Sequence, residues 1–208
     1  MYRLFCLFVK LTGAIPAALV FRTKVLYEDK KVQKRFIRGS AIVAANHNSV
    51  WDFATLMFVF WSRTLRCVVA ELMFEKNLFM NAFLRMLGCI KVDRNSHDFA
   101  FVERGKKILS DGGVVEIYPE ARIPEKDEKK PLPFKPSAVY LALESGSPIV
   151  PVHIRGKYFS RERIRVMIGK PIDVRELYDS ALSEKENIAK ITEFLRGKII
   201  ELGEQIQK

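Results

Sequence analysis

The stretch Ala41-Ile42-Val43-Ala44-Ala45-Asn46-His47-Asn48-Ser49-Val50-Trp51-Asp52 joins an apolar run to a polar turn. The run 41–45 has the length and composition of a buried strand, and Trp51–Trp61 is typical of a helix. On one continuous helix, a separation of five residues would set His47 and Asp52 about 140° apart. At a strand-to-helix turn, the carboxylate can instead fold back from the first helical turn toward the imidazole. We therefore expect a His–Asp pair at the end of a buried strand.

This stretch has two interpretations. A histidine held by a carboxylate, with no obvious Ser or Cys nucleophile in the motif, suggests a general base that acts on the substrate's own hydroxyl. Alternatively, Ser49-Val50-Trp51-Asp52 is a capping box, with Ser at the N-cap and an acid at N3, and His47 is an ordinary loop residue.

Beyond Gly39, short apolar runs alternate with longer helix-like stretches, which predicts an α/β fold with a mostly parallel central sheet flanked by helices. The predicted strands are Ala41–Ala45, Cys67–Ala70, Ile90–Val92, Val114–Tyr118, Ile149–Ile154 and Ile164–Ile168. The predicted helices are Trp51–Trp61, Leu72–Leu87, Asp98–Ser110 and Ser137–Glu144.

The C-terminal region predicts one further amphipathic helix. Apolar residues recur there at spacings of three and four, which gives a stripe expected to pack on the domain: Ile188, Ile191, Leu195, Ile199, Leu202 and Ile206. The segment 124–136, rich in Lys, Glu and Pro, is typical of an exposed loop.

The charge of the chain predicts an anionic partner. Its 208 residues carry a formal net charge of +11. The first 40 residues hold nine Lys or Arg against Glu28 and Asp29, so this segment contributes +7 of that charge. Nucleic acid, an anionic membrane surface and a phosphorylated substrate are all candidates. Nucleic acid fits poorly, because the basic residues lie beside an apolar segment rather than interleaving with aromatic residues.

The segment Leu4–Phe21 is apolar for 18 residues, but it contains Lys10, Gly13 and Pro16. Spanning a bilayer takes about 20 mostly apolar residues, and Pro16 would break or kink a helix. We expect a broken, shallowly inserted helix pair, anchored by the basic flank on anionic lipid at the cytoplasmic face of the cell membrane. The predicted division is a membrane-associating helical segment, 1–38, and a catalytic domain, 39–208. A true span, a core helix and a secretory signal are the alternatives.

The cysteines and histidines predict no metal site. Cys6, Cys67 and Cys89 are odd in number and lie in apolar contexts, which indicates buried free thiols in a reducing compartment. Only three histidines accompany them, without ligand spacing. We also expect Cys89 not to be a nucleophile, because it lies in a strand with no histidine in local register.

Charged residues follow two of the predicted strands. Arg94 ends the run Gly88-Cys89-Ile90-Lys91-Val92-Asp93-Arg94, and Glu120 and Arg122 follow Ile117-Tyr118-Pro119. Active sites of open α/β sheets gather at the carboxyl ends of the strands, so His47 and both arginines are expected to face one crevice. Two guanidiniums there suit a phosphate or carboxylate, although a lone strand-end Arg is more often a solvated charge. Lys135 could add charge to that site, but it is more simply a loop lysine.

The order of these motifs resembles the glycerolipid acyltransferases that acylate 1-acylglycerol-3-phosphate (lysophosphatidate). Residues 46–52 are similar to that family's His-x4-Asp block, 88–94 to its second block, 120–122 to its third and 149–152 to its fourth. The resemblance runs from about residue 22 to 169. One departure concerns the third block, which usually reads Glu-Gly-Thr-Arg. Glu120-Ala121-Arg122 is one residue shorter, and Ala121 adopts positive φ less easily than Gly.

The resemblance implies acyl transfer from an acyl thioester, with coenzyme A or acyl-carrier protein as donor and no cofactor. His47 would act as the base and Asp52 would orient it. Arg94 and Arg122 would hold the acceptor's phosphate, while Glu120 would orient Arg122 or bind the glycerol. Backbone N–H groups near the strand–helix turn are the candidate oxyanion donors. Acylation of glycerol-3-phosphate or another lysolipid, or a non-catalytic lipid-binding role, stay open as alternatives.

Overall fold

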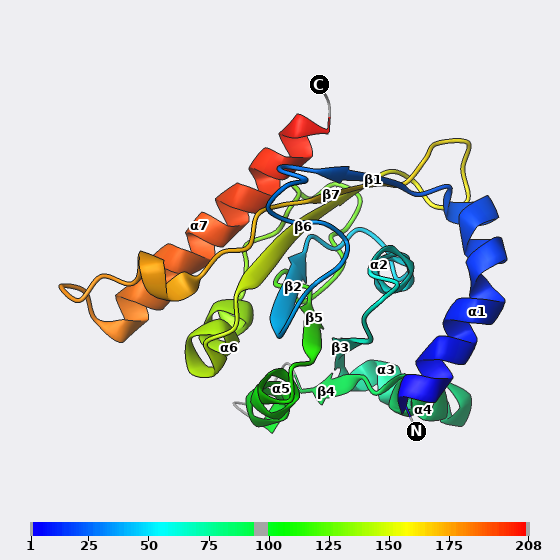
Figure 1. The fold of residues 1–208 in the computed structure, drawn as a ribbon, viewed down its shortest axis with the longest axis horizontal. Coiled ribbons are helices and arrows are strands. Elements are labelled where there is room, and N and C mark those ends of the chain that lie inside the picture. Colours follow the sequence, from blue (N-terminus) through cyan, green and yellow to red (C-terminus); the bar gives the residue numbers. More distant parts are fainter. Residues whose placement is uncertain (1, 94–99, 207–208) are drawn as a thin grey trace.

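A seven-stranded sheet forms the centre of the protein in the computed structural model, which describes residues 2–93 and 100–206 (Figure 1). The strand order is β1-β7-β6-β2-β5-β3-β4. All neighbouring strands pair in parallel except β6 and β7, which are antiparallel. The strands are β1 (Lys24–Tyr27), β2 (Ala41–Ala45), β3 (Leu65–Ala70), β4 (Ile90–Val92), β5 (Val114–Ile117), β6 (Ile149–Arg155) and β7 (Arg165–Ile168). The predicted α/β fold with a mostly parallel sheet is confirmed.

Helices cover both faces of this sheet. Along β2, Val43 packs toward α2 and the end of α1, whereas Ile42 packs toward α5, α6 and α7. This alternation is expected of a central strand buried on both faces, where successive side chains point in opposite directions. The helices are α1 (Tyr2–Phe21), α2 (Asp52–Val59), α3 (Glu71–Glu75), α4 (Leu78–Leu87), α5 (Ala100–Ser110), α6 (Ser137–Ser145) and α7 (Glu184–Gln205), with a short 3-10 helix at Val174–Leu177.

The six predicted strands match observed strands to within two residues at each end. Two predictions of helices beyond α1 were wrong. Residues 24–27, placed in a helical segment by the sequence, form β1 and pair with β7 in the main sheet. The single helix predicted over Leu72–Leu87 is two helices, because the side chain of Asn77 accepts a hydrogen bond from the Met80 N–H (2.7 Å) and starts α4 there.

The N-terminal segment is one helix rather than the expected broken pair. α1 runs through Pro16 without interruption and is long and apolar enough, by length and composition alone, to cross a membrane. Proline removes one backbone hydrogen bond inside a helix. Packing of α1 on α2 and α4 maintains the helix across that position.

The two sides of α1 differ in their surroundings. Lys10 is buried, and its ammonium donates hydrogen bonds to the carbonyls of Phe60 (3.3 Å), Trp61 (2.9 Å) and Arg63 (2.6 Å), just beyond the end of α2. The lysine therefore places a positive charge beside the C-terminal end of α2, where it is favourable, and fixes the chain that follows. The opposite side exposes a row of large apolar residues: Leu4, Leu7, Phe8, Leu11, Ile15 and Leu19. One face of α1 is tied to the domain, and the other is uncovered.

The predicted C-terminal amphipathic helix is confirmed as α7. Ser183 and Glu186 form a reciprocal capping box at its start. Its apolar stripe is buried against the sheet and α6, as expected: Ile191, Leu195, Ile199, Leu202 and Ile206. Within the segment 124–136, Leu132 and Phe134 are buried, so this loop is not exposed throughout.

Candidate active site

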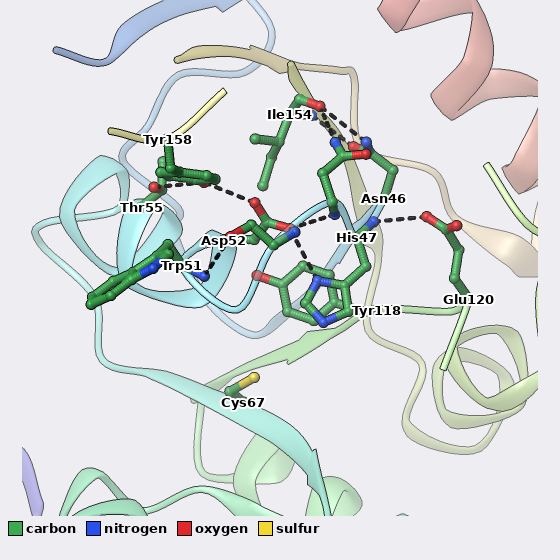
Figure 2. Close-up of polar contacts among 12 residues, drawn as sticks. Asn46, His47, Trp51, Asp52, Thr55, Cys67, Tyr118, Glu120, Ile154 and Tyr158 are labelled. Atoms are coloured by element: carbon green, nitrogen blue, oxygen red, sulfur yellow. Dashed lines mark hydrogen bonds and ion pairs between the residues drawn. The ribbon is translucent and has the colours of Figure 1, made fainter. Parts of the chain in front are cut away.

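His47 and Asp52 meet at the carboxyl end of β2, as the motif spacing predicted. The His47 Nδ1 lies 3.0 Å from the Asp52 Oδ2 (Figure 2). Asp52 is fully buried at the start of α2, whereas the His47 side chain remains 17% exposed. A carboxylate can only accept a hydrogen bond, so Nδ1 carries the proton and the other ring nitrogen is free to act as a base.

The Asp52 carboxylate also organises the loop before it. Its Oδ2 accepts the N–H groups of Asn48 (2.6 Å) and Ser49 (2.8 Å), and its Oδ1 accepts the hydroxyl of Tyr158 (2.8 Å). Together with His47, four donors surround one buried side chain. The carboxylate thus holds the imidazole and fixes the loop around it.

The capping-box interpretation of this turn is half right. The acidic half is present, since Asp52 accepts the Ser49 N–H. The Ser49 Oγ accepts the Trp51 N–H at 3.3 Å rather than the Asp52 N–H, and the residue preceding the helix is Trp51. Asp52 therefore accepts hydrogen bonds both from the backbone of the turn and from the imidazole, so the structural and functional interpretations are compatible.

Two asparagines fasten the same loop to β6. The Asn46 amide both donates to the Ile154 carbonyl (3.0 Å) and accepts the Ile154 N–H (2.7 Å). The Asn48 amide donates to that same carbonyl at 2.8 Å. These contacts join the ends of two adjacent strands and fix the backbone on either side of His47.

Tyr118 lies against the imidazole of His47. The two rings are stacked with their centroids 4.3 Å apart and their planes 24° apart (Figure 2). The Tyr118 hydroxyl donates to the buried Glu116 carboxyl at 2.5 Å. Burial raises the pKa of Glu116 to about 8. The tyrosine therefore limits rotation of the imidazole while its own hydroxyl is anchored inside the sheet.

Glu120 holds backbone rather than a guanidinium. Its Oε1 accepts the His47 N–H and its Oε2 accepts the Leu132 N–H, both at 2.7 Å. Burial raises the pKa of Glu120, although the two N–H groups oppose that shift. Among the described residues, Glu120 makes no hydrogen bond to Arg122, which bonds elsewhere. The expectation that Glu120 orients Arg122 or binds the glycerol stays a prediction.

Arg122 pairs with Glu128. The guanidinium makes two hydrogen bonds to that carboxylate (2.6 and 2.5 Å), which lowers the pKa of Glu128 to about 2. Both side chains are well exposed to solvent. Between Glu120 and Arg122, Ala121 has φ +60°, the left-handed conformation that favours glycine. Arg94 lies outside the described residues, so its phosphate-binding role stays a prediction, as does that of Arg122.

Most N–H groups of the turn that was expected to supply the oxyanion donor are already engaged. The N–H of His47 binds Glu120, and those of Asn48 and Ser49 bind Asp52. The N–H groups of Trp51 and Asp52, further along the turn, bind the side chain and carbonyl of Ser49. The N–H of Val50 takes part in none of these hydrogen bonds, so a backbone oxyanion donor from this turn stays a prediction.

The remaining sequence candidates stand apart from the pair. Burial raises the pKa of Cys89 to about 12, which keeps its thiol protonated and agrees with the expectation that it is not a nucleophile. Lys135 is exposed, and its backbone N–H binds the Pro119 carbonyl.

Sequence reasoning missed Tyr118 and Tyr158. Tyr118 lies in the run that precedes Glu120, but its contact with His47 joins the ends of two different strands. Tyr158 is 106 residues from its partner Asp52.

Comparisons with known proteins agree with this geometry. The family described as Acyltransferase matches residues 24–155, more than half of the chain. The 1-acyl-sn-glycerol-3-phosphate acyltransferase of Bacillus subtilis (strain 168) is 24% identical over 172 residues, covering 80% of this chain and 83% of that protein. The human 1-acyl-sn-glycerol-3-phosphate acyltransferase beta is 31% identical over 141 residues, covering 63% of this chain and 50% of that protein.

A solved structure shares the fold. The crystal structure of the 1-acyl-sn-glycerophosphate acyltransferase PlsC from Thermotoga maritima aligns with a TM-score of 0.71 at 18% identity, covering 100% of this chain and 82% of that one. With the His47–Asp52 pair at the end of β2 and the family match across both residues, the chain belongs to the acyltransferase family.

Proposed function

We propose that this protein transfers a fatty acyl group from an acyl thioester to the free hydroxyl of 1-acylglycerol-3-phosphate, giving phosphatidate for phospholipid biosynthesis. The observation that carries the proposal is the His47–Asp52 pair, which leaves one ring nitrogen free beside a partly exposed loop. The relatives whose names specify this acceptor support the choice of substrate.

The proposed chemistry needs one base and no acyl-enzyme. The free nitrogen of His47 takes the proton of the acceptor hydroxyl as that oxygen attacks the thioester carbonyl. Asp52 stabilises the imidazolium that forms, as in a triad whose nucleophile is supplied by the substrate. When the tetrahedral intermediate collapses, the C–S bond breaks and the departing thiolate takes the proton from His47. Tyr118, stacked on the ring, keeps it aligned through both transfers.

We propose that Arg94 and Arg122 hold the acceptor's phosphate. A guanidinium offers a bidentate fork to a phosphate, as Arg122 does to the Glu128 carboxylate. The phosphate would then exchange with Glu128, which is an exposed and therefore inexpensive partner to displace. Glu120, which the sequence also predicts at this phosphate site, would contribute by fixing His47 and the loop at Leu132.

The donor is proposed to be a thioester of coenzyme A or of acyl-carrier protein, used as a substrate rather than as a resident cofactor. Both donors are anionic, and the net charge of +11 suits either.

We further propose that α1 binds the cytoplasmic face of the cell membrane without spanning it. Its outward face exposes large apolar residues from Leu4 to Leu19, while Lys10 on the other face is bound to carbonyls of the domain. A helix tied along its length to a folded domain lies in the interface with one side in lipid. The basic residues that follow α1 would add attraction to anionic headgroups.

The test is an assay of purified protein against a panel of acceptors. With acyl-CoA as donor, lysophosphatidate is expected to give phosphatidate at the highest kcat/KM. Glycerol-3-phosphate, a lysophosphatidylcholine and a monoacylglycerol represent the rival acceptors. The first carries a phosphate monoester, and the other two do not. Preference for any of these over lysophosphatidate would overturn the proposed acceptor, and no transfer to any of them with either donor would overturn the activity.

A further inference from the structure

A cleft opens beside the catalytic loop at the carboxyl ends of β2 and β6. Its volume is about 680 Å³, and its floor includes Asn48 and Ser49, whose N–H groups bind Asp52. This volume is in the range of small-molecule sites. The carboxyl ends of adjacent strands are also where open α/β sheets bind ligands. The cleft is separate from Arg122 and Glu128, neither of which lines it.

The cleft is positively charged. Lys130, Arg155 and Lys157 line it, and no aspartate or glutamate does. All three side chains are exposed. Within residues 2–93 and 100–206, no carboxylate forms an ion pair with any of the three. Arg122 is different, because its guanidinium is already occupied by Glu128. The cleft therefore offers unpaired cations close to the catalytic loop.

One wall of the cleft is aromatic. Trp51 and Phe159 meet edge to face with their centroids 5.3 Å apart. Phe159 has φ +55° and is 64% exposed. A bulky residue rarely adopts this conformation, and such strain concentrates at functional sites. An apolar wall facing cations suits a ligand that carries both an uncharged arm and a phosphate.

The cleft is also linked to the catalytic pair. Tyr158, between the cationic and aromatic residues, donates its hydroxyl to Asp52 at 2.8 Å. Figure 2 shows Trp51 and Tyr158 on one side of the His47–Asp52 pair and Glu120 on the other. Lys130 and Pro131, next to the Leu132 that binds Glu120, also line the cleft, so it reaches from Tyr158 to the segment beside Glu120.

We propose that this cleft binds the phosphate-bearing arm of a substrate of the acyl transfer through Arg155, Lys157 and Lys130. The proposal rests on the proposed function for the identity of that substrate. Two sources share the chemistry of a phosphate on a short flexible arm: the pantetheine arm of the acyl donor and the glycerol phosphate of the acceptor.

The experiment compares two double variants of the full chain that lose the same charge. Arg155→Ala/Lys157→Ala removes cations from the cleft, and Arg104→Ala/Lys107→Ala removes exposed cations from α5 as a matched control. KM is measured separately for acyl-CoA and for lysophosphatidate at one ionic strength. The cleft variant is expected to raise one of these two constants by about tenfold or more and to leave the other within about twofold of the control.

The substrate whose KM rises identifies the arm. An increase for acyl-CoA assigns the cleft to the donor, and an increase for lysophosphatidate assigns it to the acceptor. Equal constants in the two variants, or an equal rise for both substrates, would overturn the proposal.

A binding measurement keeps the proposal separate from the proposed function. The chain has two tryptophans, so in a Trp61→Phe background the fluorescence of Trp51 reports on the cleft wall. Coenzyme A and glycerol-3-phosphate are titrated in turn. Saturable quenching by either ligand that weakens about tenfold in the cleft variant, but not in the control, supports the site even if the wild type acylates no lysophosphatidate. Quenching that is absent, or equal in both variants, would overturn it.

Discussion

The loop Asn46–Asp52 and the turn Glu120–Arg122 lie at the ends of adjacent strands, yet they are held in opposite ways. In the loop, Asp52 is fully buried with four hydrogen-bond donors around it, and two asparagines tie the loop to β6. In the turn, Ala121 has a strained backbone, and the exposed Arg122 is held by Glu128.

The difference indicates that the two segments have different roles. The group proposed to move the proton is fixed by buried contacts, which a substrate does not need to rearrange. The group proposed to meet the phosphate is held by one exposed ion pair, which contributes little stability and exchanges easily. On the proposed function, catalytic geometry would belong to the fold, whereas acceptor recognition would belong to a replaceable surface contact.

Glu116→Gln tests the buried side of this comparison and is expected to have the largest effect on stability. The pKa of Glu116 is raised by burial from about 4.5 to about 8, so between these values the folded state retains a proton that the unfolded state has released. The free energy of unfolding should therefore fall as pH rises from about 4.5 to 8, by a few kcal/mol at about 1.4 kcal/mol per pKa unit.

Urea unfolding at pH 5.5, 7 and 8.5 measures this effect. The glutamine variant should lose that decline and gain stability over the wild type as pH rises. Glu103→Gln, on the exposed face of α5, is the control and should keep the wild-type slope. Parallel pH profiles for wild type and Glu116→Gln would show that the buried carboxyl is not held protonated.

Arg122→Ala tests the exposed side. Losing a charged hydrogen bond to the acceptor's phosphate should cost about 1.5–3 kcal/mol, which appears as a KM for lysophosphatidate about 10- to 100-fold higher. The free energy of unfolding should change little, since the pair with Glu128 is exposed. Glu128→Gln should leave this KM unchanged or lower it, because the guanidinium no longer has a competing carboxylate. Equal losses with a monoacylglycerol acceptor would rule out a phosphate role for Arg122.

Ala121→Gly should give the smallest effect, a gain in stability of about 0.5–1 kcal/mol. Glycine adopts φ +60° without the steric cost that alanine carries, and its greater freedom when unfolded offsets part of the gain. Thermal unfolding should show a rise in Tm of about 1–4 °C. Ala181→Gly, at an exposed turn position without positive φ, is the matched control and should lower Tm or leave it unchanged. A lower Tm for Ala121→Gly would mean that the turn is not strained.

Much of the fold was predictable because local patterns report on burial. Apolar runs marked the inner strands, and the spacing of His47 and Asp52 placed both at one strand end. β1 was missed because its four residues follow a long apolar helix and are only partly buried. The continuity of α1 through Pro16 depends on packing against α2 and α4, which no local pattern records.

The site was predictable where it is local and not where it is long-range. His47 and Asp52 are five residues apart, so their pairing could be predicted. The contacts of Glu120 with Leu132, of Tyr158 with Asp52 and of Asn46 with Ile154 join residues 12 to 108 positions apart. The Arg122–Glu128 pair is local, but the turn that creates it depends on the positive φ of Ala121.

The most direct test of the central claim is the rate of acyl transfer by His47→Ala, measured beside Asp52→Asn. If His47 is the base, kcat/KM should fall by about 10²–10⁴-fold for His47→Ala, and Tm should stay near the wild-type value because the side chain is partly exposed. Asp52→Asn should also lose activity, since an amide no longer selects the tautomer with a free basic nitrogen. A folded His47→Ala protein with kcat/KM within about threefold of wild type would contradict the account.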